Sequence, residues 1–427
     1  MSLNRSTPPA IKQATDFTIE LPSCETISLS ETNKLYTVNA GTQDVISFEI
    51  YMPKLLETPN EVVVSKAVAS LLKSGTVSMT ALQINEQIEQ VGGSISISQN
   101  NDFFIIKITC LTKHFTNLLP LLFEIIQAPT FPKEELEIYR QQAMQHMSVN
   151  LKKSEFVANR TIDELIYGFE HPYGSYSLME DYQCVTQVDL VNFHKKYISL
   201  EKATFFLSGK YEASIVKTIQ SEFEKRTVTT AAILKPIAAV KPAESKKHRI
   251  TNDEKALQGA IRIAKKFVSR THQDFIPMLF TNTLFGGYFG SRLMSNIRED
   301  KGYTYGIYSF VQQNMEANTY VIATDVGKDV AEKAVDEVWN EMKRLRTEPV
   351  PSEELQLVKN YILGSILGSI DGPFKIMSRW KSLILNNRDA KQFQKSVDTY
   401  KKITAEKIME LANTYYQEED FYNLIVY

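Results

Sequence analysis

The sequence predicts an α+β protein made of two similar halves, each a mixed, mostly antiparallel sheet with packed helices. One observation is an order of strand, helix and Pro-led helix start that occurs twice, about half of the 427-residue chain apart. A second is a run of helix, Gly-Gly stop and alternating strand in the first half. Such a run is typical of an α+β layer with an antiparallel component.

The repeated order is the strongest sign of an internal duplication. Its first copy is the strand-like run 103–110, the helical run 115–126 and the start Phe131-Pro-Lys-Glu-Glu-Leu136, and its second copy is 319–324, 331–345 and Val350-Pro-Ser-Glu-Glu-Leu355. In both starts, two carboxylates follow the proline into the first helical turn, where the helix dipole favours them. Chance similarity between two common helix starts is the alternative, and the matching order favours duplication.

The helix, stop and strand lie in residues 80–98. Thr80 and Gln83 have the spacing of a capping box, which predicts a helix start. Leu82, Ile84 and Ile88 give a mostly helical apolar pattern, and Gly92-Gly93 ends it. Ser94 to Ser98 alternates with period two, as a half-buried strand does.

A segment with two prolines and no clean period separates the halves. We therefore expect an N-terminal domain at 1–228, an extended linker at 229–248 and a C-terminal domain at 249–427.

Composition excludes several classes of protein. The formal net charge is −2 and the pI about 6.4, so no overall field favours nucleic acid or an anionic membrane. No run of 18 apolar residues predicts a membrane span. Three widely spaced cysteines, without a CxxC pair, argue against a disulfide framework and a cysteine zinc site. The opening residues lack an apolar signal-peptide core, so we expect a cytoplasmic protein, or a periplasmic one if a leader has been removed.

The most informative segment runs from Leu284 to Tyr308. A glycine loop, Gly286, Gly287 and Gly290, allows a tight backbone before a helix, but it lacks the spacing of a phosphate loop. We expect Ser291 to cap a helix that ends near Asp300. Residues 303–310 then read as a strand with Tyr303, Tyr305 and Ile307 on one face.

This segment resembles the glycine-rich, Ser-Arg-Leu, Arg-Glu and Tyr run of the M16 metallopeptidases, the pitrilysin, insulinase and mitochondrial processing peptidase family. The resemblance covers about residues 30–427 and implies two tandem, homologous M16-type domains that face each other like a clamshell. It assigns Arg298 and Tyr305, in the second domain, to the substrate backbone near a zinc site. In the alternative, Arg298 pairs with a nearby acid, Tyr305 lies in the core, and both only support the fold.

The same resemblance locates the zinc site in the first domain, where active members carry HxxEH on a helix. Counting back from Gly75-Thr76 places these positions at Lys66, Ala69 and Ser70, and none is a normal zinc ligand or catalytic carboxylate. The family's third ligand is a Glu farther on, but residues 138–154 contain no Asp or Glu and only His146. The resemblance therefore implies a degenerate site, with no metal or cofactor in this chain. His171, in a family-like His-Pro-Tyr-Gly segment, is expected to be a turn residue.

Some members of the family divide these groups between two chains. The leading hypothesis is thus a non-catalytic, substrate-binding subunit, predicted inactive alone, that forms a heterodimer with an HxxEH-bearing, zinc-containing partner and degrades or processes peptides. The alternative is a structural or assembly protein, or a peptide-binding homodimer without a protease partner. An unrelated enzyme has little support, because adjacent pairs such as Glu353-Glu354 point apart on a helix and are expected to be solvated or favoured by the helix dipole. The strand at 93–98 is a further candidate edge for peptide addition.

Overall fold

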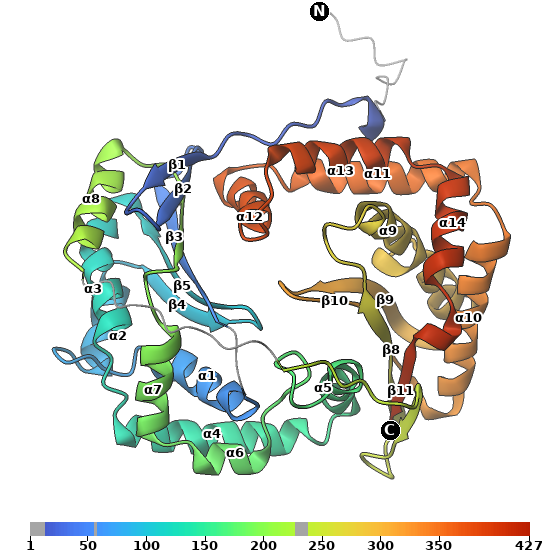
Figure 1. The fold of residues 1–427 in the computed structure, drawn as a ribbon, viewed down its shortest axis with the longest axis horizontal. Helices are drawn as coiled ribbons and strands as arrows, with labels where there is room; N and C mark the ends of the chain where they lie inside the picture. Colours follow the sequence, from blue (N-terminus) through green and yellow to red (C-terminus); the bar gives the residue numbers. More distant parts are fainter. Residues whose placement is uncertain (1–12, 55–57, 227–237) are drawn as a thin grey trace, which may run out of the picture.

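A computed structural model describes residues 13–54, 58–226 and 238–427. It contains two sheets, one per half of the chain, each with helices on its faces (Figure 1).

The first sheet is mixed and mostly antiparallel. Its strand order is β1-β2-β6-β3-β5-β4, and among these neighbours only β2 and β6 run parallel. The strands are β1 (Glu25–Ser28), β2 (Lys34–Asn39), β3 (Val45–Pro53), β4 (Ser94–Gln99), β5 (Phe103–Leu111) and β6 (Thr204–Gly209).

The second sheet repeats this arrangement. Its order is β7-β11-β8-β10-β9, and only β7 and β11 run parallel. Five strands of each sheet therefore correspond in order and direction, and β1 is an addition to the first sheet. The predicted α+β class and the predicted duplication are both confirmed. The strands are β7 (Lys247–Ile250), β8 (Gln258–Phe267), β9 (Thr304–Gln313), β10 (Asn318–Gly327) and β11 (Tyr422–Val426).

The helices also repeat along the chain. The first half has α1 (Asn60–Leu71), α2 (Ala81–Gln90), α3 (Phe115–Gln127), α4 (Lys133–Asn150), α5 (Ser154–Tyr167), α6 (Met179–Cys184), α7 (Gln187–Tyr197) and α8 (Ala213–Glu224). The second half has α9 (Phe275–Asn282), α10 (Ala331–Thr347), α11 (Ser352–Gly368), α12 (Pro373–Ile384), α13 (Ala390–Lys402) and α14 (Ala405–Tyr415). No helix in the described ranges has the length and apolar character needed to cross a membrane.

The local signals in residues 80–98 are borne out, except that Leu82 is exposed and only Ile84 and Ile88 form the buried face of the helix. The Thr80 side chain accepts from the Gln83 backbone in a capping box that opens α2. Gly92 adopts a φ of 58°, a left-handed conformation that glycine adopts without steric cost and that ends the helix. Ser94 then begins β4, which lies at the edge of the first sheet.

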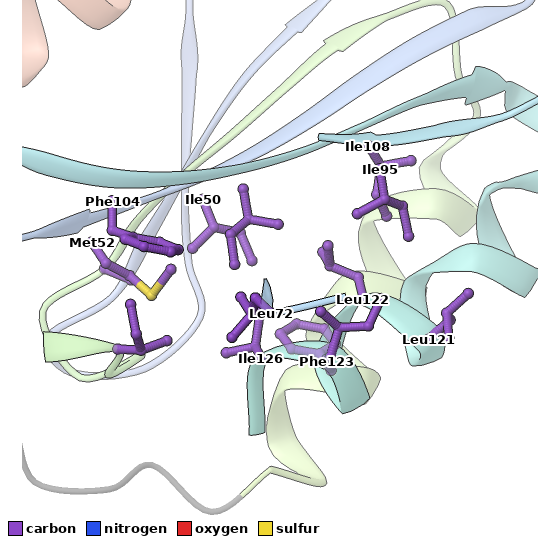
Figure 2. Packing of buried hydrophobic residues seen from close by; sticks show 14 of the residues in the cluster. Ile50, Met52, Leu72, Ile95, Phe104, Ile108, Leu121, Leu122, Phe123 and Ile126 are labelled. Carbon is purple, nitrogen blue, oxygen red and sulfur yellow. The ribbon is translucent and has the colours of Figure 1, made fainter. Parts of the chain in front are cut away.

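Each sheet packs one face against the helices of its own half. In the first half, side chains of β3 and β5 meet those of α1 and α3 (Figure 2). The labelled residues of this core are Ile50, Met52, Leu72, Ile95, Phe104, Ile108, Leu121, Leu122, Phe123 and Ile126. A corresponding core in the second half joins β8 and β10 to α10, α11 and α14, and it also takes in Ile19 from the start of the chain.

The other face of each sheet is covered by a helix from the opposite half (Figure 1). Helix α5 packs Ala158, Ile162 and Ile166 against β8 and β11, and Arg262 Nε donates to Asn159 Oδ1 at 2.7 Å. Helix α12 packs Ile376 and Met377 against β2 and β6, and an ion pair of 2.7 Å joins Lys381 to Glu49 of β3. The two halves are therefore interlocked.

The expected linker, 229–248, is described only in part, because residues 229–237 lie outside the described residues. Beyond them, the backbone amides of Lys241 and Ala243 donate to the carbonyls of Tyr167 and Leu165 at the end of α5. The last two residues of the range already belong to β7. This part of the segment is thus fixed along α5 and joined to the second sheet.

Candidate functional site

The degenerate zinc positions lie on α1. Lys66 Nζ donates to Ser177 Oγ at 3.0 Å, Ala69 is half-buried and Ser70 is exposed. Burial lowers the pKa of Lys66, and the nearby Arg160 charge acts in the same direction. An ammonium group and a methyl group offer zinc no ligand atom, so this donor set does not fit the metal.

The position of the third ligand gives the same result. On α4, His146 is exposed, while the neighbouring Met147 is buried in the first core. Within the described ranges, no group of three or more His, Cys, Asp or Glu side chains is placed to hold a metal ion.

The His-Pro-Tyr-Gly segment forms a buried turn. His171 Nδ1 accepts from the Tyr173 backbone at 3.1 Å, and the imidazole stacks on Tyr167 with ring centroids 5.1 Å apart. Burial lowers the pKa of His171, and the positive charge of Lys266 lowers it further. The Tyr173 hydroxyl donates to Asp102 Oδ1 at 2.6 Å, so the turn connects to the tip between β4 and β5.

The glycine loop begins inside a π-helical turn, η3 (Thr283–Gly287), which contains Gly286 and Gly287. Gly290 lies between η3 and a second such turn, η4 (Met294–Asp300). Gly286 packs directly on β9, since a Cβ there would lie 2.5 Å from Ser309 Oγ. The predicted Ser291 cap is wrong, because its hydroxyl is buried and has no hydrogen-bond partner. Its backbone carbonyl still accepts from the Ser295 amide at 2.9 Å. The predicted strand after Gly302 is confirmed as β9.

Arg292, next to that serine, fixes the loop to α11. Its guanidinium makes two hydrogen bonds of 2.8 Å to the carboxylate of Glu354. Glu354 lies in the first turn of α11, where the helix dipole favours an acid as expected, and a bidentate ion pair with Arg292 holds the carboxylate in addition.

Arg298 lies on η4 and is partly exposed. Its guanidinium lies over the Phe289 ring, 4.6 Å from the centroid, and its Nη1 is 3.6 Å from Glu299 Oε1. The stacking holds the guanidinium plane while leaving edge N–H groups for a further acceptor.

Tyr305 is 94% exposed, so it does not lie in the core. The expectation that it shares a face with Ile307 is wrong, because Ile307 is fully buried. The cause is a β-bulge: Thr304 pairs with Val326 and Ile307 with Thr324, so Tyr305 and Gly306 together oppose Asp325. A bulge re-aims the side chains beside it, and here it leaves the Tyr305 phenol in solvent.

The structure thus brings the glycine loop, Arg298 and Tyr305 into one unit of η3, η4 and β9, whereas the degenerate zinc positions lie on α1 of the other half. Sequence reasoning missed the aromatic side chains beside this unit. Phe289 is 60% exposed, and Tyr308 and Phe310 of β9 are about half exposed. For Tyr308 and Phe310 a signal was present in the density of aromatic residues along 303–310.

Two duplicated, interlocked α+β domains, with an HxxEH position on a helix of the first and an Arg/Tyr unit in the second, define a zinc-peptidase fold that lacks its zinc ligands. Family comparisons agree with this class. Residues 54–171 match the model of "Insulinase (Peptidase family M16)", and residues 185–362 match that of "Peptidase M16 inactive domain". The chain belongs to the M16 peptidase family.

Curated relatives are distant but similar over most of their length. A Bacillus subtilis protein named "Uncharacterized zinc protease YmxG" is 19% identical over 367 residues, which is 85% of this chain and 88% of that protein. A Helicobacter pylori protein named "Non-peptidase homolog YmxG" is 22% identical over 316 residues, 73% of this chain and 72% of the relative.

Solved structures share the fold. A peptidase M16 inactive domain from Pseudomonas fluorescens superposes with a TM-score of 0.85 at 19% identity, covering 95% of this chain and 98% of the other. A protease from Helicobacter pylori gives 0.83 at 15% identity, with 95% and 99% covered.

Proposed function

We propose that this chain is the non-catalytic, substrate-binding subunit of a two-chain M16 zinc peptidase, whose partner carries HxxEH and the zinc. Two observations together support this proposal. Arg298 and Tyr305 are both reachable from solvent, and α1 offers no zinc ligand at Lys66, Ala69 and Ser70. Hydrolysis of a peptide needs metal-bound water and an oriented carbonyl, and the two can come from different chains.

The donors suit a substrate backbone. A guanidinium and a phenol can both donate to a peptide carbonyl. Stacking on Phe289 limits the rotamers of Arg298 before substrate arrives, which lowers the entropy lost on binding. The open edges of β4 and β9 in the described sheets could accept an extended peptide as an added strand.

The names of two relatives support a chain that is inactive by itself. One is called a non-peptidase homolog, and one solved neighbour is titled an inactive domain.

We also place the protein in the cytoplasm, a proposal supported by Cys24, Cys110 and Cys184, which form no disulfide. Metal analysis of the purified chain should find no stoichiometric zinc; one tightly bound zinc per chain would contradict this part.

The decisive test is affinity purification of the chain from its native cells, followed by mass spectrometry. We expect an equimolar partner of similar size that contains HxxEH. Recovery of this chain alone would favour the second candidate, a peptide-binding or scaffolding homodimer.

In the assembled pair, Arg298→Ala should reduce kcat/KM about 10- to 100-fold, the effect of losing one charged hydrogen bond to substrate. Lys343→Ala is the control, because Lys343 is an exposed cation on the outer helix α10. Equal turnover of the Arg298 variant and this control would remove Arg298 from substrate binding.

A further inference from the structure

Three cations gather beside the degenerate zinc positions, and we call them the cation cluster: Lys54, Lys66 and Arg160. Lys54 directly follows β3, Lys66 lies on α1 and Arg160 lies on α5. Within the described part of the chain, none of the three forms an ion pair with a carboxylate. Lys54 is buried, whereas Lys66 and Arg160 are half-buried. A buried lysine without an acidic partner is rare.

Neutral groups hold the two lysines. Lys54 is 3% exposed, and its Nζ donates to Ser65 Oγ at 3.2 Å and to Gln99 Oε1. Lys66 donates to Ser177 Oγ. These oxygens satisfy donors but do not neutralise charge.

Arg160 is held by stacking. Its guanidinium lies 4.5 Å from the centroid of Tyr176, and its buried Nε has no hydrogen-bond partner. Tyr176 and Ser177 are adjacent in the chain, so consecutive residues hold Arg160 and Lys66 close to one another. The result is a guanidinium, with an Nε that has no partner, close to an ammonium group.

The charges of the cluster act on one another. Burial lowers the pKa of Lys54 to about 7, and Lys66 contributes in the same direction. Burial and then Arg160 lower the pKa of Lys66. Burial and the neighbouring positive charges thus both disfavour the protonated lysines, and an arriving anion would stabilise their charged forms.

The surrounding acids are engaged elsewhere. Asp102 accepts from Tyr173 and from the backbone of Met315, Glu61 pairs with Lys196 at 2.7 Å, and Asp181 accepts from the Leu178 amide at 2.6 Å. They moderate the field at the two lysines, and the Lys54 backbone amide also donates to the Asp102 carbonyl at 2.7 Å. Asp163, one turn after Arg160, bonds Gln312 of β9.

We propose that the cation cluster is a carboxylate-binding site, which takes the C-terminal carboxylate or an Asp or Glu side chain of a peptide bound to this chain. A guanidinium edge binds a carboxylate through two parallel hydrogen bonds, and an ammonium adds a point charge. The inference rests on the proposed peptide-binding role, and it assigns a substrate class to it: peptides with a carboxylate at a fixed place.

The length of β9 suggests where that carboxylate lies. Gln312, which contacts Asp163 next to the cluster, is about seven residues along β9 from Tyr305, or roughly 23 Å at the usual strand rise. A peptide of about nine residues can therefore span from Tyr305 to the cluster.

The test measures fluorescence anisotropy of the full chain with one labelled peptide of about nine residues in three forms. These are a free C-terminal carboxylate, a C-terminal amide, and the amide with a final Glu. We expect the free acid to bind at least about 10-fold more tightly than the amide. Recovery of affinity by the final Glu shows that a side-chain carboxylate is also accepted, whereas no recovery restricts the site to chain ends.

Lys66→Met and Arg160→Met should each remove the preference, so that acid and amide bind alike. Lys217→Met is the control, because Lys217 is exposed on the outer helix α8. The preference should also weaken as the pH rises from about 6 to 8, because Lys54 loses its proton in this range.

Equal binding of acid and amide by the unmodified chain, or no binding of any form at millimolar peptide, would overturn the proposal. If Arg298→Ala weakens all three forms while acid and amide bind equally, the proposed peptide-binding function survives and the carboxylate site falls. If acid and amide bind differently but Arg298→Ala weakens neither, the carboxylate site survives and the proposed role of Arg298 in peptide binding falls.

Discussion

At the scale of single residues, Asp163 shows how burial raises the pKa of a carboxyl group. Its Oδ1 is buried without a hydrogen-bond partner, and burial raises the carboxyl pKa from 3.8 to about 7, moderated by a bond from Gln312. The folded chain therefore holds this proton more tightly than the unfolded chain does. The contribution to stability is present below about pH 4 and is lost as the pH rises through 7.

Asp163→Asn should remove this dependence. We expect the variant and the original chain to unfold with similar free energies near pH 4, and the variant to be about 2–4 kcal/mol more stable at pH 8, where the carboxylate is charged. Urea unfolding at both pH values measures the difference. Parallel curves for the two proteins across this range would contradict the raised pKa.

The sequence could predict part of the candidate site. The spacing of Arg298 and Tyr305 and the absence of ligands at Lys66, Ala69 and Ser70 can be read directly from it. The bulge that turns Tyr305 away from Ile307 could not be predicted, because a period-two pattern assumes regular pairing. The cation cluster was also invisible, since Lys54, Lys66 and Arg160 come from three separate elements.

At the scale of elements, the contact of η3 with β9 depends on a missing side chain. A Cβ on Gly286 would lie 2.8 Å from Leu293 Cδ1 and 2.9 Å from the Ser309 amide, as well as against the Ser309 hydroxyl. Both neighbours are buried and belong to the second half. The turn must therefore move if the glycine is replaced.

Gly286→Ala should destabilise the chain by about 1–3 kcal/mol, the usual cost of overpacking. Gly364→Ala is the matched control: it lies inside α11, an added Cβ meets nothing within 4 Å, and it should stabilise by about 0.5–1 kcal/mol. Thermal unfolding of both variants gives the comparison. An unchanged melting temperature for the Gly286 variant would show that the π-helical turn can shift without loss of stability.

Most element boundaries followed from local chemistry. The caps, the Gly92 stop and the Pro-led helix starts depend on only a few neighbouring residues, so the local sequence is enough to predict them. The π-helical turns η3 and η4 do not have such a signal. Their widened backbone depends on packing against β9 and α11, which sequence periodicity does not report.

At the scale of the whole molecule, the exchange of α5 and α12 makes each sheet depend on the other half. The chain has two tryptophans, and they report on different places. Trp339 on α10 packs near Phe421 of the second half, whereas Trp380 on α12 donates to the Pro22 carbonyl near the first sheet.

We expect Trp339→Phe and Trp380→Phe variants, each with one remaining reporter, to show the same denaturant midpoint, once each is corrected for its own stability by circular dichroism. Coincident transitions indicate one cooperative unit. Separate fluorescence midpoints, with one transition resolved in each variant, would show that the halves unfold independently.

The sequence was sufficient for the duplication, because strand, helix and helix start recur in the same order in both halves. The sequence did not predict that α5 and α12 each cover the sheet of the opposite half. The apolar faces of α5 and α12 show that each helix covers something, but not that the sheet it covers is encoded on the far side of the linker.

The exchange also has a consequence during synthesis on the ribosome. The face of the first sheet that points toward the second half, with Val38 and Phe206, is complete once β6 has emerged, but its cover is α12, which ends at Ile384 (Figure 1). An apolar strand surface is thus exposed while nearly half of the chain is still being translated. Nascent chains of this protein should need a chaperone on that surface, or slow folding of the first half, until the last helices arrive.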